Sequence, residues 1–212
     1  MNIAIWHHPM LRALAPNPQT ARNKHLSNPN LLSAILHHQT RMNCRNRQQA
    51  NQMLTFSPDE IIIIGAMSES RAIGKGEGMP WNVPEEYQYF VDSVHHQTVI
   101  MGRRSYDIFG ADFEADTFVI SRSAKIDGVT VCSSIDDAMQ QAAKLGNAIF
   151  ISGGRSIYAL GIPLANRMLL STIKGDYEGD VQFPEFDENN WTLANEEDYD
   201  RYILRDWRRV TA

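Results

Sequence analysis

Short apolar runs recur along most of the chain, and their length is the feature that most constrains the fold. The run at 61–67 opens with four consecutive isoleucines and is followed by Ser-Glu-Ser. A continuous apolar run of this length, bounded by polar residues, is typical of a strand buried on both faces of a parallel sheet. Five further runs of strand length follow at 98–101, 117–121, 129–132, 148–151 and 168–173.

Helical patterns lie between several of these runs. Pro84 suits the first turn of a helix, and the pattern predicts a helix from Pro84 to about Ser93. Ser134, with Asp137 three residues later, predicts an N-cap and a second helix that runs through Leu145. Strands that alternate with helices in this way predict an α/β sheet with crossover helices.

The first 58 residues differ in composition from the rest of the chain. They hold six Arg or Lys and no Asp or Glu, so the remaining residues carry a net charge of −11, against −5 for the whole chain. The segment also lacks a sustained apolar period from which a core could form. We therefore expect 1–58 to be a basic, disordered extension and 59–212 to be the folded domain. Alternatively, the extension is a transit peptide, or translation starts at Met42 or Met53.

The composition excludes several classes of protein. No apolar run approaches the roughly 18 to 20 residues that cross a bilayer, so no membrane association is expected. Cys44 and Cys132 are the only cysteines, which excludes a disulfide framework and a cysteine-built zinc site. A reducing, cytoplasmic location is therefore expected, unless the extension is an organellar presequence.

Metal and nucleic-acid sites are not expected either. The histidine pairs of the extension, at 7–8 and 37–38, have no carboxylate or cysteine partners beside them, so they are not predicted to bind a metal. The acidic net charge of the remaining chain argues against a nucleic-acid partner.

Two of the predicted strand-to-helix junctions are rich in glycine, at 99–105 and 149–156. Glycine lets the backbone approach a ligand closely, and the N–H groups at the start of a helix favour phosphate. Arg103, Arg104 and Arg122 lie nearby in the sequence and favour a dinucleotide with an extra phosphate, NADP rather than NAD. The plain structural alternative is a pair of tight turns with surface arginines. The Gly-x-Gly-x-x-Gly fingerprint does not occur, which disfavours the common dinucleotide-binding fold.

A glycine-rich stretch leads into the first predicted helix, which carries two adjacent carboxylates. At about 100° per residue, Val83 and Phe90 share an apolar face, with Glu86 close to that face and Glu85 on the far side with Tyr89. A carboxylate that points toward an apolar face is desolvated, which raises its pKa toward neutrality. Glu86 is therefore a candidate acid that binds and helps to protonate a cationic or amidine-like heterocycle. The alternative is a carboxylate at the edge of the core, hydrogen-bonded to local backbone.

Taken together, these motifs resemble the dihydrofolate reductase family. Residues 78–86 are similar to the family's substrate loop and acid helix, with Glu as the carboxylate where other members have Asp. Residues 98–103 and 151–158 are similar to its two cofactor junctions, and 178–184 to a late loop. The resemblance covers the chain from about Glu60 onward. It implies a single, mostly parallel mixed sheet flanked by helices, and an NADPH-dependent enzyme that reduces 7,8-dihydrofolate to tetrahydrofolate.

The resemblance also implies the residues of the site. Glu86 would fix the pyrimidine end of the pterin and support protonation of N5 through water held near Trp81, while hydride passes to C6. The residues implied to line the pterin cleft are Ile64, Met79, Glu86, Phe90, Phe109, Phe113 and Ser171; the three phenylalanines could equally be plain core. The residues implied to hold NADPH are Ala66, Ile73, Gly74, Arg103, Arg104, Ser105, Ser121, Arg122, Gly153, Gly154, Arg155, Ser156, Ile157 and Tyr158. A cis peptide bond is implied between Gly153 and Gly154.

One loop departs from the family pattern. Where the family presents an arginine to the glutamate tail of folate, residues 110–116 contain Asp112, Glu114 and Asp116 and no base. Ser152 also replaces the usual aliphatic residue beside the pterin. Two alternatives stay open: a reductase of the same fold that acts on a tail-less pteridine or a ribosylaminopyrimidine, and a nucleotide-binding module without catalysis. The enzyme is expected to be a monomer whose partner is a small-molecule substrate, dihydrofolate.

Overall fold

The computed structural model describes residues 56–76, 78–122 and 125–210. The chain divides into two units, Met1–Leu54 and Thr55–Ala212, and the description below concerns the second. The predictions made for residues 1–55, including the alternative starts at Met42 and Met53, lie outside the described residues.

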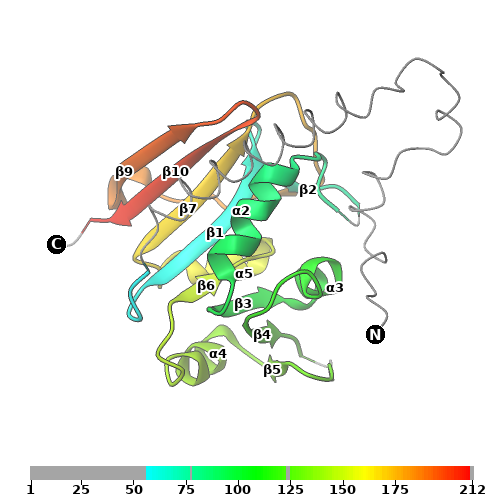
Figure 1. Ribbon diagram of the computed structural model, residues 1–212, viewed down its shortest axis with the longest axis vertical. Helices are drawn as coiled ribbons and strands as arrows, with labels where there is room; N and C mark the ends of the chain where they lie inside the picture. The colour runs from blue at the N-terminus through cyan, green and yellow to red at the C-terminus, as the bar shows by residue number, and fades with distance from the viewer. Residues whose placement is uncertain (1–55, 77, 123–124, 211–212) are drawn as a thin grey trace, which may run out of the picture. The chain divides into compact units, whose positions relative to one another are not determined.

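Most of the strands in the described part form one mixed sheet (Figure 1). Its members are β1 (Ile61–Ser68), β3 (Thr98–Gly102), β4 (Asp116–Ile120), β5 (Thr130–Cys132), β6 (Ile149–Ile151), β7 (Arg167–Ile173), β9 (Trp191–Asp198) and β10 (Tyr202–Arg209). Their order is β5-β4-β3-β6-β1-β7-β10-β9. Neighbours are parallel except at β7–β10 and β10–β9, which are antiparallel. The mostly parallel mixed sheet implied by the resemblance is therefore confirmed.

A second, smaller sheet was not predicted. It pairs β2 (Ala72–Gly74) with β8 (Val181–Gln182) in antiparallel fashion. Lys75 and Gly78 form an isolated bridge directly after β2. Part of the glycine-rich stretch before the first helix is therefore built into local β-structure.

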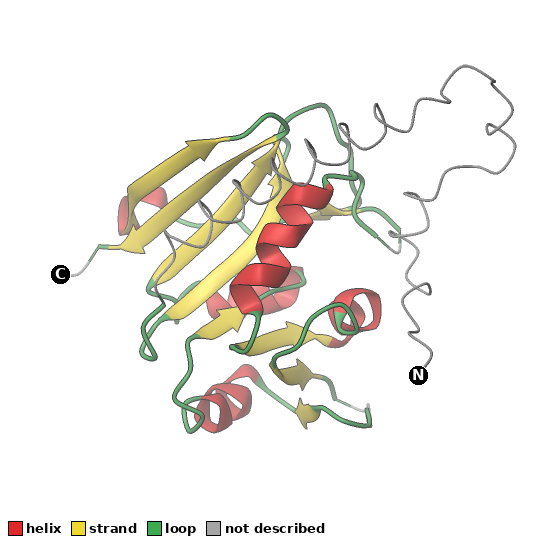
Figure 2. Cartoon of the chain, viewed as in Figure 1, coloured by secondary structure: helices red, strands yellow, loops and turns green. Residues whose placement is uncertain are grey.

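Helices lie on both sides of the main sheet (Figure 2). They are α2 (Pro84–Val94), α3 (Arg103–Phe109), α4 (Ile135–Ala142) and α5 (Arg155–Gly161), with a short 3₁₀ turn η2 (Glu188–Asn190). In Figure 1, α2 crosses in front of β1 and α5 lies behind the sheet. None of the described helices is long and apolar enough to cross a membrane.

The predicted helix starts are confirmed, but one predicted end is wrong. α2 begins at Pro84, and before α4 the Ser134 hydroxyl accepts the N–H of Asp137 at 3.2 Å. α4 ends at Ala142 rather than at Leu145. Its last turn tightens, because the N–H of Leu145 bonds three residues back to the carbonyl of Ala142.

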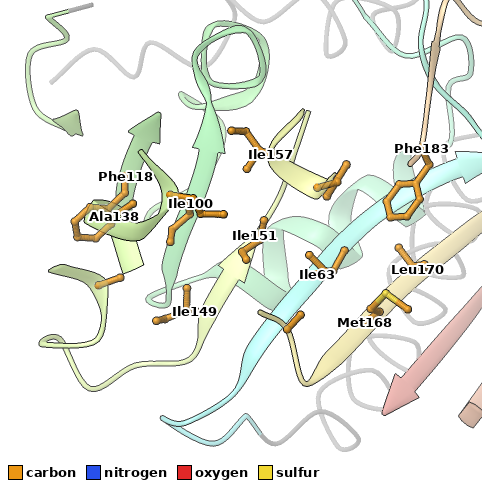
Figure 3. Packing of buried hydrophobic residues seen from close by; sticks show 14 of the residues in the cluster. Ile63, Ile100, Phe118, Ala138, Ile149, Ile151, Ile157, Met168, Leu170 and Phe183 are labelled. Atoms are coloured by element: carbon orange, nitrogen blue, oxygen red, sulfur yellow. The ribbon is translucent and has the colours of Figure 1, made fainter. Parts of the chain in front are cut away.

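The core lies between the sheet and the helices α4 and α5. Figure 3 shows Ile63 of β1, Ile151 of β6 and Met168 of β7 packed together in this layer, with Ile157 of α5 and Ala138 of α4. The neighbours of Ile63 along β1 must face the opposite side, since side chains alternate along a strand. They are buried as well, which is what the continuous apolar run at 61–67 predicts.

The start of the described domain is anchored by Phe56. Its ring packs edge-to-face on Phe150, with the ring centroids 4.9 Å apart. The Arg167 guanidinium lies 5.4 Å from the centroid of the same ring. Arg167 is buried and forms a two-pronged ion pair with Asp206, with N–O distances of 2.9 and 2.8 Å. The packing of the domain therefore extends from Phe56 onward.

Deletion of residues 1–52 is expected to leave the unfolding midpoint and the activity unchanged, because that segment has no apolar face in its sequence and the first core strand, β1, begins at Ile61. Phe56→Ala should lower the free energy of unfolding by about 1–3 kcal/mol, less than the roughly 3–5 kcal/mol of a fully buried Phe. Thermal melts and initial rates of the truncated chain check the first expectation. A fall of several degrees on truncation would show that the deleted segment stabilises the domain.

Candidate active site

The two predicted glycine-rich junctions meet at the carboxyl ends of β3 and β6, which are parallel neighbours. The N–H of Gly102 donates to the carbonyl of Gly153 at 2.7 Å. A Cβ atom on Gly102 would lie 3.7 Å from the backbone nitrogen of Gly154, and one on Gly154 would lie 3.4 Å from Ser105 Oγ. The two junctions thus form one continuous backbone surface.

Only glycine fits at the centre of this surface. Gly153 has a φ of 98°, and a Cβ there would lie 2.9 Å from the ring of Tyr158. The Gly153–Gly154 peptide bond is cis, as implied by the resemblance. The buried Tyr158 hydroxyl donates to the carbonyl of Ile64 at 2.9 Å, and burial raises the pKa of this phenol. Tyr158 thus ties the junction to β1.

The three predicted arginines lie along the same edge of the sheet. Gly102 of β3 is paired in register with Ile120 of β4, so the segments that follow them, at 103–105 and 121–122, are neighbours. Arg103 pairs with Asp107 at 2.7 Å, and Arg104 donates to the carbonyl of Gly76. Both of these side chains and that of Arg122 are exposed.

The remaining predicted cofactor residues lie in strand β2 and in the first turn of helix α5, and they differ in exposure. Ile73 and Gly74 lie in β2, where the carbonyl of Gly74 accepts the N–H of Asp180 at 3.0 Å. Arg155 and Ser156 are exposed in the first turn of α5. Ile157 is only 5% exposed and packs with the core cluster, so its side chain belongs to the core and not to the cofactor surface. The cofactor role implied for Ile157 stays a prediction, which the buried side chain leaves to the backbone.

Glu86 lies at the start of α2, on the side that faces the sheet. Its carboxylate side chain is 5% exposed, whereas Glu85 is exposed and pairs with Arg201, whose Nε lies 2.6 Å from Glu85 Oε1. Burial raises the pKa of Glu86 from 4.5 to about 7; a hydrogen bond from Ser171 opposes this shift, and the nearby charge of Glu85 adds to it. The prediction that helical geometry turns Glu86 inward and Glu85 outward is confirmed.

An apolar cluster adjoins Ser171, the hydrogen-bond partner of Glu86. Trp81 is buried and packs edge-to-face on Tyr177, with ring centroids 5.9 Å apart. The cluster that contains Trp81 also includes Ala66 of β1, which is paired in register with Ser171 of β7. Met79 packs on the same cluster. The structure therefore brings the predicted residues of the acid side together at the carboxyl ends of β1 and β7.

One residue of α2 lies elsewhere than predicted. Tyr89 was expected on the solvent side with Glu85, but it is half buried and packs against the cluster that contains Tyr202 and Leu204 of β10. The sequence pattern did not predict β10, so it could not show that α2 is covered from a second side.

The three predicted phenylalanines form a half-exposed aromatic surface with Tyr87. The rings of Phe90 and Phe113 meet edge-to-face with centroids 5.5 Å apart, and Tyr87 lies 6.0 Å from both Phe90 and Phe109. The Tyr87 hydroxyl donates to the carboxylate of Asp112, a contact that the sequence did not predict. Because these rings remain partly exposed, they form a surface that can receive a flat apolar group.

Ser152 lies between the two halves of the site, at the end of β6. Its hydroxyl oxygen is buried, and among the described residues it has no hydrogen-bond partner. A buried hydroxyl without a partner costs about 1–3 kcal/mol. A polar ligand atom at this point would supply the missing partner.

The raised pKa of Glu86 predicts a pH-dependent stability. The folded state holds the Glu86 proton more tightly than the unfolded state, so this stabilising contribution is complete below about pH 4.5 and is lost as the pH rises through about 7. A shift of this size corresponds to about 3 kcal/mol. Glu86→Gln should therefore gain up to about 3 kcal/mol of unfolding free energy relative to the wild type between pH 5 and 8. Denaturant melts of both proteins measure this difference, and a difference that does not change with pH would contradict it.

The chain is similar in sequence to proteins of one family. The family model described as dihydrofolate reductase matches residues 60–203, more than half of the chain. The dihydrofolate reductase of Bacillus subtilis (strain 168) is 34% identical over 140 residues, which cover 65% of this chain and 83% of the relative. That of Neisseria gonorrhoeae is 33% identical over 139 residues, which cover 64% and 85%.

A solved structure shares the fold. The dihydrofolate reductase from Enterococcus faecalis, complexed with NADP(H) and RAB-propyl, matches with a TM-score of 0.67 and 24% identity. The match covers 74% of this chain and 99% of that structure. At this identity the likeness concerns the fold.

Proposed function

The chain belongs to the dihydrofolate reductase family, and from this premise we propose that it reduces 7,8-dihydrofolate to tetrahydrofolate with NADPH. The observation that carries the proposal is the buried carboxyl group of Glu86, with its pKa raised to about 7 and Ser171 beside it. A carboxyl group that is about half protonated at neutral pH can both accept from an amidine-like ring edge and release a proton.

The residues at the two glycine junctions fit NADPH. Gly102, Gly153 and Gly154 leave a backbone surface that a Cβ would fill. Arg103, Arg104 and Arg122 lie on the same edge and would hold the additional phosphate. When bound, NADPH supplies the hydride that reduces C6 of the dihydropterin.

The protein's own groups supply the proton and the orientation. Glu86 would bind the pyrimidine edge of the ring and support protonation of N5 through water held near Trp81. The apolar cluster around Trp81 restricts bulk water, which keeps the Glu86 pKa high and the proton available at neutral pH. Phe90, Phe109 and Phe113 would contact the flat part of the substrate.

Isotope transfer tests this reaction directly. We expect NADPH that carries deuterium at its transferable position to yield tetrahydrofolate with one deuterium at C6, as read by mass spectrometry and NMR. The proton taken up at N5 exchanges with solvent, so N5 carries deuterium in heavy water and loses it when the product is transferred to ordinary water. Label at another carbon, or none in the product, would contradict the proposed chemistry.

NADPH is expected to be preferred over NADH. One charge-assisted hydrogen bond of about 1.5–3 kcal/mol to the 2′-phosphate corresponds to roughly a 10- to 150-fold preference in kcat/KM. Arg122→Ala and Arg104→Ala should each reduce the preference and leave the rate with NADH unchanged. Equal use of both cofactors by the wild type would mean that these arginines are surface residues without a role in binding.

A second candidate function has one specific observation in its favour. Asp112, Glu114 and Asp116 make the loop between α3 and β4 acidic, so an anionic substrate tail would find no partner within it. A reductase of a tail-less pteridine or a ribosylaminopyrimidine would suit this loop. Comparison of dihydrofolate with dihydropteroate, a tail-less pteridine, distinguishes the first of these substrates and is described in the Discussion.

Other properties of the protein stay predictions. The family shares a small-molecule substrate. A monomeric state is an expectation that no sequence feature supports, whereas a cytoplasmic location and the lack of nucleic-acid or membrane partners are inferred from composition. Gel filtration at two protein concentrations tests the first of these, since a monomer elutes at both with the mass of one chain, 24.0 kDa.

A further inference from the structure

Three metal-ligating side chains gather at one corner of the described domain. His95 and His96 follow α2 directly, and Glu114 lies in the loop between α3 and β4. One ligand atom from each residue lies within 4.8 Å of the other two, and all three side chains are exposed. The imidazole rings are close together, with centroids 3.8 Å apart. The group lies about 14 Å along α2 from Glu86, so it is separate from the proposed catalytic acid.

Backbone hydrogen bonds hold the two segments in place. The N–H of His96 donates to the carbonyl of Glu114 at 2.9 Å, and the N–H of Asp116 donates to the carbonyl of Gln97 at 3.0 Å. His96 has a φ of 57°, a left-handed conformation that turns the chain sharply at the end of α2. The backbones of two of the three potential ligands are therefore bonded to each other directly, so ion binding requires ordering of the side chains and little ordering of the backbone.

We propose that His95, His96 and Glu114 form a binding site for a divalent transition-metal ion of the zinc type. Two imidazoles and one carboxylate suit Zn²⁺, Co²⁺ or Ni²⁺, whereas Mg²⁺ and Ca²⁺ take oxygen ligands. Ligand atoms of a tetrahedral zinc site with bonds of about 2.0–2.1 Å lie about 3.4 Å apart. Rotation of the exposed side chains closes the present spacing to that value, and water completes the coordination.

The ion would connect the end of α2 to the acidic loop. Its two positive charges would offset most of the charge of Asp112, Glu114 and Asp116. Metal binding at this site does not depend on the proposed reaction. An experiment can therefore disprove the metal site without disproving the proposed function, and the reverse.

Isothermal titration of zinc chloride into the full chain tests the proposal. The extension carries five further histidines, at 7, 8, 25, 37 and 38, so a parent in which all five are alanine is titrated beside the wild type. We expect the parent to bind one zinc ion, and zinc to raise its unfolding midpoint because the site exists only in the folded chain.

Site variants are made in the same parent. His96→Asn keeps a residue that tolerates a left-handed φ, and Glu114→Gln removes one carboxylate. Each should weaken zinc binding by at least the roughly 10- to 100-fold that loss of a supporting partner costs at a metal site. Glu185→Gln, at an exposed carboxylate elsewhere, is the matched control and should change nothing. A parent without zinc binding, or a Glu114→Gln variant with unchanged affinity, would overturn the proposed site.

Discussion

Glu86→Gln is expected to lower the rate of hydride transfer at pH 7 by one to three orders of magnitude. Glutamine preserves the shape of the side chain but cannot release a proton, and general acid catalysis contributes roughly 10²–10⁴-fold. Solvent can supply part of the missing proton, which reduces the expected loss. The measurement is single-turnover oxidation of NADPH in the presence of saturating dihydrofolate.

The pH profile separates a working acid from a structural group. Because the pKa of Glu86 is raised to about 7, the wild-type rate should fall as the pH rises through that value. The variant should approach the wild type in acid, where the substrate takes its proton from solvent. A variant with the same fractional loss at every pH would indicate that Glu86 acts only through structure.

Glu85→Gln is the matched control. It changes the adjacent carboxylate on the same helix, and the geometry turns that carboxylate to solvent, where it pairs with Arg201. Surface ion pairs contribute about 0–1 kcal/mol, so the rate should change by less than about threefold. Equal effects of the two substitutions would contradict the assignment of the acid.

Dihydrofolate is expected to have a high Michaelis constant for an enzyme of this family, and dihydropteroate, which lacks the glutamate tail, should be used nearly as well. The reason is the acidic loop: it contains no base, and the Asp112 carboxylate accepts from Tyr87 beside the aromatic surface. Loss of one charge-assisted contact of about 1.5–3 kcal/mol corresponds to roughly 10- to 150-fold in affinity.

A charge reversal in this loop provides the test. Asp116 is exposed at the start of β4, and Asp116→Arg should create a preference for the glutamylated substrate, measured as the ratio of kcat/KM for the two substrates. Asp116→Asn removes the charge without adding a base, and we expect it to have a smaller effect. The assays contain a chelator, so that a metal ion at His95, His96 and Glu114 does not mask the loop charge.

The salt dependence of the preference for dihydrofolate over dihydropteroate shows whether an exposed charge causes that preference. Exposed charges are screened within about 10 Å at 0.1 M salt. If the wild type already prefers dihydrofolate by more than tenfold, and the preference weakens in salt, another basic residue reaches the tail and the role given to the loop is wrong.

The parts of the fold that could be predicted are those with a local sequence signal. The apolar run at 61–67 is buried on both faces because β1 lies inside a parallel sheet. The continuous apolar pattern predicts this burial without any information from distant segments. Glu86 and Glu85 differ by one helical step, and 100° of rotation is enough to separate a buried from an exposed carboxylate. Gly153 was implied by its glycine-rich junction and by the resemblance, and the structure gives the reason: its conformation and the nearby ring of Tyr158 admit no side chain.

The parts that could not be predicted depend on contacts between distant segments. β9 is exposed along most of its length, so it has no apolar alternation to reveal a strand, and β2 and β8 are too short to show a period. The position of Tyr89 depends on β10, more than 100 residues later. The contacts Tyr87–Asp112 and His96–Glu114 join α2 to the loop after α3, and neither pair has a spacing that a sequence pattern marks.

The most direct measurement of the central claim is the initial rate of NADPH oxidation by the full chain, with dihydrofolate and with a ribosylaminopyrimidine in parallel. We predict rapid oxidation with dihydrofolate, tetrahydrofolate formed in equal amount, and little oxidation with the aminopyrimidine. We also predict that Glu86→Gln removes most of the rate at pH 7. Oxidation only with the aminopyrimidine, or with neither compound, would contradict the account.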